Sequence, residues 1–221
     1  MFPRLHLVGD AALNIEWPQG PQANALARSL HASLLADPPI GYQESLPALQ
    51  CLLLRFDPLT TDPQQLELAL TKRLQGLDST SLKPGRLWRI PVCYDPECGL
   101  DIEALAAAKK MTPEKLAELH GARTYTALFL GFLPGFAYLG GLDEALSAPR
   151  HEKPRTTVPS GSVALAGELT AIYPLESPGG WQIIGRTPVK MFDVARPEHS
   201  LLAPGDEIQF FPITLATFAS S

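Results

Sequence analysis

Three arginines stand in the glycine- and proline-rich part of the sequence between residues 131 and 187. They are Arg150, Arg155 and Arg186, and each lies next to a proline or a glycine. A planar guanidinium can hold a carboxylate or a phosphate through two parallel hydrogen bonds, so these side chains are candidates for anion recognition. Ordinary ion pairing at the surface is the competing interpretation for each of them.

A short run of small residues could add further anion donors. Ser160, Gly161 and Ser162 follow a proline, and they could present hydroxyls and backbone N–H groups to a negatively charged ligand. The same residue types are typical of a capped β-turn. The sequence leaves both interpretations open.

His120 is a candidate acid or base because the unperturbed pKa of histidine lies near ~6.5. It ends a predicted helix over residues 112–120, which Thr112 can cap and in which Pro113 fits the first position. A histidine at this place can also serve the helix alone, since the last carbonyls of a helix favour a cation.

Aromatic residues recur among the glycines of the same stretch. Because proline fixes φ and glycine permits positive φ, the chain path here is specified closely, as in many binding loops. Aromatic side chains on such loops could line a groove or anchor a partner, and barrel corners and a barrel core would show the same pattern. The expected partner-interface residues are Phe132, Pro134, Phe136, Tyr138 and Trp181.

The elements before residue 82 predict a small α+β domain of ferredoxin-like type. Alternating or continuous apolar residues predict strands over 5–8, 12–17 and 49–56, and leucines at helical spacing predict helices over 23–35 and from 61 onward. The order is therefore strand, strand, helix, strand, helix. Polar residues 78–85, which end in Pro-Gly, predict the linker.

Residues 83–221 predict a mainly β domain. A strand over 87–94 and helices over 101–109 and 112–120 precede several short strands between residues 125 and 212, which are separated by Gly and Pro. This pattern favours a β-barrel over an open sheet, with 208–211 as its closing strand.

Composition excludes several classes of function. A net charge of −5 with 18 scattered Lys and Arg residues provides no basic stripe for nucleic acid. No apolar run approaches the ~20 residues that span a bilayer, and the N-terminus lacks a secretory signal, so we expect a cytoplasmic protein without a membrane partner. Cys51, Cys93 and Cys98 form no even disulfide framework and lack the spacing of a zinc site, which predicts free thiols and no metal.

Many short blocks, in one order, make the chain resemble the B-subunit family of bacterial 5-oxoprolinases. The family also includes the kinase-inhibitor proteins of sporulation and allophanate hydrolase subunit 1. The resemblance covers nearly the whole chain, although the loop 95–101 departs from the glycine-rich run of many members. Its strongest blocks are Leu119-His120, Gly131-Phe132-Leu133-Pro134-Gly135-Phe136-Ala137-Tyr138-Leu139, Pro154-Arg155, Val158-Pro159-Ser160-Gly161-Ser162, Pro178-Gly179-Gly180-Trp181 and Ile184-Gly185-Arg186-Thr187-Pro188.

The resemblance implies a ferredoxin-like domain followed by a cyclophilin-like barrel. It also implies one half of a carboxyltransferase-type module, with the C subunit as the other half and the A subunit completing the ATP-dependent opening of 5-oxoproline to glutamate. This sequence has no phosphate loop of the Gly-x-x-x-x-Gly-Lys type, so we expect the complete complex, not this chain alone, to use ATP. The chemistry asks for anion recognition and a proton carrier, which makes His120, Arg155 and Arg186 the candidate catalytic residues, with Arg150 and residues 160–162 binding the anion.

Two function classes stay open at this point. The first is a hydrolase component that is inactive alone and shares a site or an interface with the C subunit; urea-linked carboxyl transfer belongs to the same class. The second is an inhibitor that docks the aromatic and arginine surface on a sensor histidine kinase. The sequence does not separate these classes, and the hydrolase component is the commoner expectation for a free-standing chain of this kind.

Overall fold

The computed structural model describes residues 2–20, 22–78, 82 and 85–221, and the chain divides into two compact units. The first unit is Met1–Lys83 and the second is Pro84–Ser221. The sequence predicted domains of 1–82 and 83–221. Most of the predicted linker, residues 79–81, 83 and 84, lies outside the described residues.

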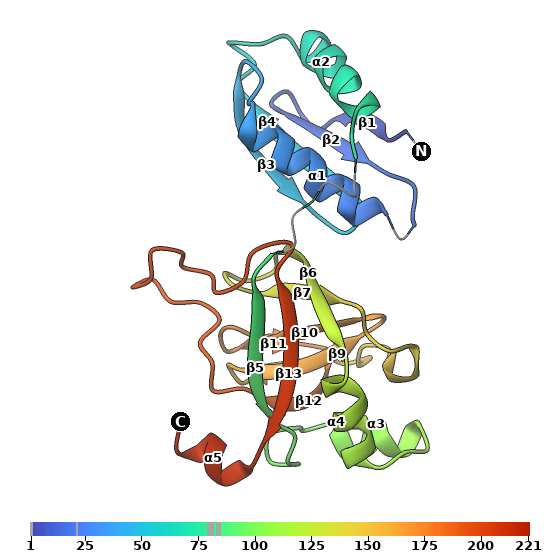
Figure 1. Ribbon diagram of the computed structural model, residues 1–221, viewed down its shortest axis with the longest axis vertical. Coiled ribbons are helices and arrows are strands. Elements are labelled where there is room, and N and C mark those ends of the chain that lie inside the picture. Colours follow the sequence, from blue (N-terminus) through green and yellow to red (C-terminus); the bar gives the residue numbers. More distant parts are fainter. Residues whose placement is uncertain (1, 21, 79–81, 83–84) are drawn as a thin grey trace. The chain divides into compact units, whose positions relative to one another are not determined.

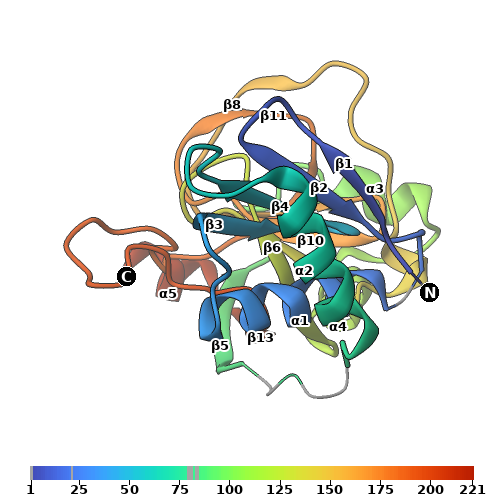
Figure 2. The same cartoon turned by 90° about the horizontal axis from the view of Figure 1, so that it is seen from above.

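The first unit is an antiparallel sheet with two helices (Figures 1 and 2). The strands β1 (Arg4–Leu7), β2 (Ala12–Glu16), β4 (Cys51–Phe56) and β3 (Tyr42–Pro47) lie side by side in that order. The helices are α1 (Ala23–Ala36) and α2 (Pro63–Gln75). The sequence missed β3, because an edge strand that carries Gln, Glu, Ser and Pro has little apolar alternation.

Both helices pack on one face of this sheet. Asp62 caps α2 by accepting the Gln64 N–H at 2.9 Å, and Leu66, Leu70 and Leu74 then point toward the strands. Leu68 is 65% exposed because it lies two residues from Leu66 on the helix and so faces away from the strands. The core joins these leucines to the apolar sides of β2, β4 and α1, including Leu13, Ile15, Trp17, Leu30, Leu34, Leu52, Leu54 and Phe56.

The second unit contains the expected barrel, and it is closed by seven strands. Their order around the barrel is β10, β7, β6, β13, β5, β12 and β9. The last strand, β13 (Glu207–Ile213), pairs in parallel with β5 (Leu87–Cys93) and antiparallel with β6 (Thr124–Leu130), so it closes the barrel as predicted (Figure 1). The other four are β7 (Ala137–Gly140), β9 (Ser162–Ala166), β10 (Leu169–Ile172) and β12 (Gln182–Arg186).

These last four strands are covered on both faces. Leu139, Val163, Leu165 and Ile184 point into the barrel, where they meet Tyr125 and other interior residues. Their neighbours in sequence point outward into a second apolar cluster, which also holds Val158 from a two-stranded sheet of β8 (Arg155–Val158) and β11 (Ser177–Gly179). Strands buried on both faces lose the polar alternation that identifies an exposed strand.

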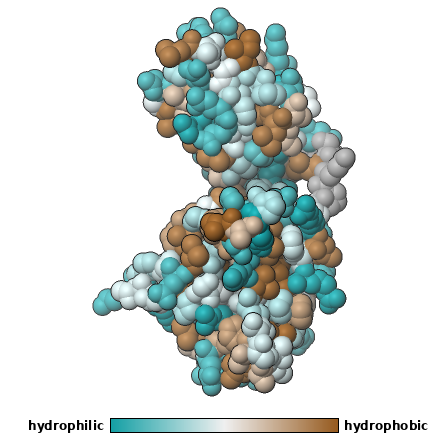
Figure 3. Space-filling view, turned by 90° about the vertical axis from the view of Figure 1, so that its left-hand side faces the viewer, coloured by the Kyte–Doolittle hydropathy of each residue, from teal (hydrophilic) through white to brown (hydrophobic). Residues whose placement is uncertain are grey.

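Short helices complete the second unit. The helices α3 (Ile102–Ala108) and α4 (Pro113–Gly121) contribute Ile102, Leu105 and Leu116 to the interior cluster. A 3₁₀ turn, η2 (Glu144–Leu146), adds Leu146, and α5 (Leu215–Ala219) ends the chain. Within the described residues, no helix has both the length and the apolar character that a membrane span requires. On the face in Figure 3, hydrophilic and hydrophobic residues alternate in small groups over both units.

Candidate functional site

Four of the five predicted interface residues meet in one aromatic cluster on the outer wall of β7, β9, β10 and β12. Phe136 lies at its centre, with ring centroids 4.9 Å from Tyr138, 5.3 Å from Tyr173 and 5.8 Å from Trp181. Phe132 completes the cluster at 5.4 Å from Phe136. The contacts are edge-to-face, the arrangement that the charge distribution of aromatic rings favours.

Phe132 is the exposed member of this aromatic cluster. It is 61% exposed, and its φ of 70° is a conformation that a bulky residue adopts at a cost. Hydrogen bonds hold the loop in this shape: Gly131 N–H donates to Phe136 O at 3.1 Å, and Phe136 N–H donates to Leu133 O at 3.0 Å. A fixed loop therefore presents an aromatic ring to solvent, with Pro134 exposed beside it.

The burial of Phe136 and Trp181 corrects part of the predicted interface. Phe136 is 1% exposed and Trp181 is 5% exposed, so in this structure both rings pack within the chain and cannot touch a partner. Tyr138 is half-buried in the same cluster. The glycines around them serve close packing as well, since a Cβ at Gly179 would lie 2.3 Å from the Tyr173 hydroxyl.

Arg155 is paired with a carboxylate that the sequence did not single out. Its two terminal nitrogens donate to the carboxylate of Asp101, one at 3.0 Å and the other at 2.5 Å. Asp101 is 6% exposed, and Arg155 is partly exposed on β8. The charge of Arg155 is therefore already neutralised within the chain, which supports the alternative of ion pairing over direct grip of a ligand.

Asp101 also ties the barrel wall to α3. Its Oδ2 accepts the Ile183 N–H of β12 at 2.7 Å and lies 3.3 Å from Nε2 of His151. Burial raises the pKa of Asp101, but the bonds from Arg155, Ile183 and His151 outweigh it and hold the pKa below its usual range. A lone aspartate before a helix is typical of a cap, and the carboxylate here makes no bond to its own helix.

The other two predicted arginines differ in their surroundings. Arg150 is exposed and lies over the Trp181 ring, 5.7 Å from its centroid, and within the described part of the chain it makes no ion pair. Arg186 donates from Nε to Ser160 O at 2.8 Å and lies over Phe218 at 5.5 Å. Arg150 is thus the arginine of this region that is best placed to receive an anion from solvent.

The run at Ser160 forms a β-turn. Ser162 N–H donates to Pro159 O at 3.2 Å, and Gly161 takes a φ of 83°, which the third position of a type II turn requires. Gly161 N–H donates to Tyr173 O at 2.7 Å, and the Ser160 hydroxyl donates to Pro174 O at 2.9 Å. These three donors are engaged within the chain, which favours the β-turn interpretation over donation to an anion.

His120 lies inside the barrel, not at a surface. Its ring is fully buried and stacks on Phe210 with centroids 4.6 Å apart. Tyr94 Oη lies 2.7 Å from Nδ1, and Thr170 Oγ1 lies 3.0 Å from Nε2. Because the Thr170 hydroxyl donates to Ala164 O at 3.1 Å, Nε2 must be the donor to Thr170, and Nδ1 accepts from Tyr94.

This setting removes His120 from acid–base chemistry with a substrate. Burial lowers the pKa of His120 to about 3, so the ring is neutral in ordinary buffers. A catalytic histidine must touch the reacting atoms, and this one is enclosed by side chains of its own barrel. The prediction of a catalytic His120 is therefore corrected. His120 instead links Tyr94 to Thr170 by hydrogen bonds across the barrel interior.

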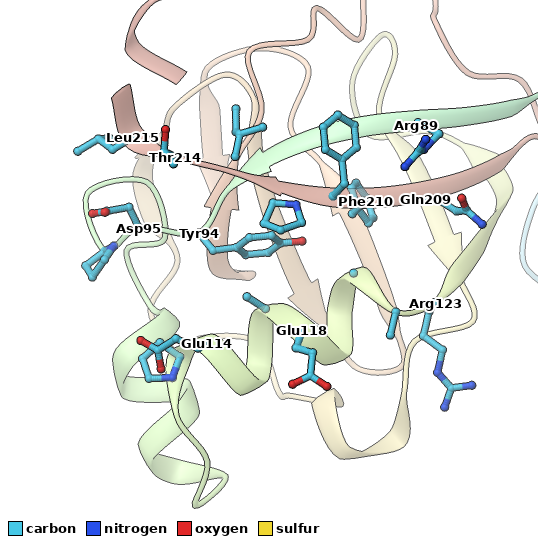
Figure 4. A pocket seen from close by; sticks show the side chains of 18 of the residues that line it. Arg89, Tyr94, Asp95, Glu114, Glu118, Arg123, Gln209, Phe210, Thr214 and Leu215 are labelled. Carbon is cyan, nitrogen blue, oxygen red and sulfur yellow. The ribbon is translucent and has the colours of Figure 1, made fainter. Parts of the chain in front are cut away.

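A groove of about 1030 Å³ opens between α4 and β13, and sequence reasoning missed it (Figure 4). We call it the α4–β13 groove. Gly121 lets the helix approach the strand, since a Cβ there would lie 3.3 Å from Phe210 O. Residues of β5, of the loop after β5 and of the start of α5 also line the groove. The apolar lining includes Pro96, Pro113, Ala117, Phe210, Phe211, Pro212, Ile213 and Leu215.

The charges of the α4–β13 groove are segregated along its length. Figure 4 places Asp95 and Glu114 toward one end and Arg89 and Arg123 toward the other. Glu103 and Glu118 also line it. The available signal was the pair of glutamates Glu114 and Glu118, one turn apart on a helix, but such a pair is also usual on a solvated helix face. In the ranges that the structure describes, no group of three or more His, Cys, Asp or Glu residues could hold a metal ion.

Known proteins match this chain over almost its entire length. Residues 3–202 match the family model of the carboxyltransferase domain, subdomain C and D. The chain is 38% identical to the 5-oxoprolinase B subunit of Escherichia coli O157:H7 over 95% of both proteins. It is 31% identical to the protein of the same name from Bacillus subtilis (strain 168), over 96% of this chain and 93% of that protein.

Solved structures show the same fold in a chain of similar length and within longer chains. A conserved uncharacterized protein from Pyrococcus horikoshii is 38% identical, with a TM-score of 0.59 over 97% of this chain and 100% of that one. TTHA0988 is 35% identical with a TM-score of 0.79, and this chain spans 40% of its length. The urea amidolyase of Kluyveromyces lactis shares the fold at 18% identity and a TM-score of 0.79, over 99% of this chain and 15% of that one.

The likeness to urea amidolyases in sequence is partial. The protein of Lachancea kluyveri is 33% identical over 41% of this chain and 6% of its own length. The 5-oxoprolinase proteins, in contrast, match from end to end. From the matched domain and these full-length relatives, the chain belongs to the 5-oxoprolinase B-subunit family and carries the carboxyltransferase domain, subdomain C and D.

Proposed function

We propose that this chain is the B subunit of an ATP-dependent 5-oxoprolinase, which hydrolyses 5-oxo-L-proline to L-glutamate. The observation that carries the proposal is the end-to-end match to the Escherichia coli protein of that name, at 38% identity over 95% of both chains. In this assembly the chain is inactive alone, and ATP is used by the complete complex. The C and A subunits of 5-oxoprolinase are the proposed partners.

The exposed residues Phe132 and Pro134, which we call the rim of the aromatic cluster, form the proposed contact with the C subunit. Phe132 and Pro134 stand on a loop fixed by its own hydrogen bonds, so binding a partner orders no further residues there. Phe136 and Trp181 support this rim from below as packed rings. An aromatic anchor on a rigid base is the usual form of an interface residue that contributes much binding energy.

Arg150 is the proposed anion-binding residue of this face. It is exposed and lies over the Trp181 ring, 5.7 Å from its centroid. Arg155 is neutralised by Asp101, which leaves Arg150, of the two, as the available cation of this face. The carboxylate of 5-oxoproline, or a phosphate formed from ATP, matches such a site in charge.

The longer relatives support a site shared between polypeptides. TTHA0988 holds the equivalent of this chain within 40% of its length. We infer that the barrel face of this chain likewise forms one half of a cleft that another polypeptide completes. The second unit is proposed to be a cyclophilin-like barrel, and the first a variant of the ferredoxin-like fold in which β1 at the N-terminus takes the place of a strand after α2.

Reconstitution tests the proposed function. The three purified subunits, mixed with 5-oxoproline and ATP, are expected to release glutamate, whereas mixtures that lack this chain are expected to release none. A complete mixture that assembles but releases no glutamate would remove the substrate assignment. In the same assay, Arg150→Ala is expected to lower glutamate release by at least tenfold while complex formation persists; Arg86→Ala, an exposed arginine paired with Glu198, is the matched control.

A further inference from the structure

The α4–β13 groove lies on the side of the barrel opposite the aromatic cluster. Going around the seven strands, β13 and β5 are farthest from β10, whose outer side is covered by that cluster. In Figure 1, β13 and β5 lie side by side in front of β9 and β10. The two surfaces are therefore separated by the full width of the barrel, so one partner contact need not compete with the other.

Four acidic side chains and one available cation define the charge of the groove. Asp95, Glu103 and Glu114 are exposed, and Glu118 pairs with Lys115 at 2.8 Å. At the other end, Arg123 is engaged by Asp143. Arg89 is exposed, lies over Phe211 at 5.6 Å and makes no ion pair within the described residues. The groove thus offers an acidic end, an apolar middle and a basic end.

The open edge of β13 is poorly suited to pairing with an added strand. In its ladder with β6, β13 is paired only over Glu207–Gln209, and the rest of that edge lies along the groove. Pro212 lies in this stretch and has no N–H to donate to an incoming strand. Recognition must therefore use side chains, as when a helix lays its apolar face into a groove.

The charges match a helix that runs antiparallel to α4. Helices are stabilised by acidic residues in the first turn and basic residues in the last. In the antiparallel direction the acidic first turn of an incoming helix lies beside Arg89, and its basic last turn lies beside Asp95 and Glu114. The dipoles of the two helices then oppose each other, which is the favourable arrangement. The nine residues of α4 rise about 13 Å, so about two and a half turns of the incoming helix are in contact.

We propose that the α4–β13 groove binds an amphipathic helix of a second partner protein, acidic at its N-terminal turn and basic at its C-terminal turn. The identity of that partner rests on the proposed function: it is the A subunit, because the C subunit contacts the Phe132 face. This chain then holds two subunits at once, on opposite sides of its barrel.

Hydrogen–deuterium exchange of the full chain tests the groove directly. The exchange is measured for the chain alone, with the C subunit, with the A subunit, and with both. The C subunit is expected to protect 131–136, and the A subunit is expected to slow exchange in 113–122 and 209–215 by at least tenfold. Unchanged exchange of both groove segments in the complete assembly would overturn the proposal.

A variant of the groove floor provides the second measurement. Ala117→Arg fills the groove and is expected to weaken binding of the second partner at least tenfold, with the circular dichroism spectrum unchanged. Ala108→Arg, at an exposed position of α3 outside the groove lining, is the matched control and is expected to bind normally. Wild-type affinity of a folded Ala117→Arg variant would contradict the proposal. Both measurements report binding and not glutamate release, so the groove can be confirmed even if 5-oxoproline proves to be the wrong substrate.

Discussion

The two sides of the barrel differ in what covers them. On the side of β9 and β10, the outward residues are sealed by the aromatic cluster, by β8 and β11, and by the bonds of Asp101. On the side of β5 and β13, the helix α4 and the start of α5 approach, and the α4–β13 groove stays open. The first side uses most of its distinctive residues for its own packing, whereas the second keeps its surface available.

This difference shows that a distinctive sequence pattern does not by itself mark a surface that is free to bind a partner. Glycines of the covered side are required because a Cβ would collide with a neighbour, as at Gly161, where it would lie 2.3 Å from Thr187 O. The open side is lined by ordinary Ala, Pro, Glu and Arg residues. A stretch can therefore look specialised because it closes a fold. A binding surface can in turn look unremarkable in sequence.

The largest expected effect compares two aspartates, one on each side. Asp101→Ala leaves the Ile183 N–H and the Arg155 guanidinium without their acceptor, and loss of one partner from a largely buried pair typically costs about 3 kcal/mol. Asp95→Ala, in the same loop but exposed in the groove, is expected to change the free energy of unfolding by less than about 0.5 kcal/mol. Urea denaturation of both variants measures the contrast. Equal losses would show that the covered side does not depend on Asp101.

A pH titration tests the buried His120, whose hydrogen bonds to Tyr94 and Thr170 cross the barrel interior between the two sides. The pKa of His120 in the folded chain is about 3, whereas the unfolded chain takes up its proton near pH ~6.5. The folded state therefore loses stability as the pH falls below about 6.5, by about 2 kcal/mol between pH 6 and pH 4.5. His120→Gln, which does not titrate, is expected to flatten this part of the curve measured by urea denaturation. An identical slope in the variant would place the pH dependence elsewhere.

Most of the fold was predictable because local signals agreed with the packing. Pro113 and Thr112 gave the start of α4, leucine spacing gave α1 and α2, and the Gly and Pro punctuation of the second unit predicted a barrel. The helix α5 was missed, and so was β3, an edge strand with few apolar residues that is placed by its pairing with β4, which the sequence does not show.

For the candidate site, the sequence grouped aromatic and arginine residues, and their role in binding stays a prediction. The sequence brought Phe132, Arg150 and Arg155 to one face, but it could not tell which rings face inward, because burial depends on β8 and β11 folding over β9 and β10. Asp101 was missed since its partners are 54 and 82 residues away in sequence. His120 was given the wrong role for the same reason: Tyr94 and Thr170 enclose it only in the closed barrel.

Phe132→Ala tests the one aromatic ring that the covered side leaves exposed. The isolated variant is expected to keep the wild-type melting temperature within about 2 °C, because the ring is mostly solvated. Affinity for the C subunit is expected to fall at least tenfold, which corresponds to about 1.4 kcal/mol. Val194→Ala, another exposed apolar side chain of the second unit, is the control for isothermal titration calorimetry. Unchanged affinity of the Phe132 variant would remove this loop from the interface.

The smallest expected effect concerns the basic end of the open side. Arg89→Ala removes a cation from above Phe211, a contact that contributes about 0.5 kcal/mol when exposed, so the isolated chain is expected to unfold at nearly the same urea concentration. Binding of the second partner is expected to weaken threefold to fivefold at low salt, and the loss should shrink as salt rises, because an exposed charge pair is screened. Arg86→Ala, which removes an exposed arginine of the same strand region outside the groove lining, controls for net charge. If the two variants lose affinity equally, the charge of the groove does not orient its ligand, and the contrast between the two sides reduces to packing alone.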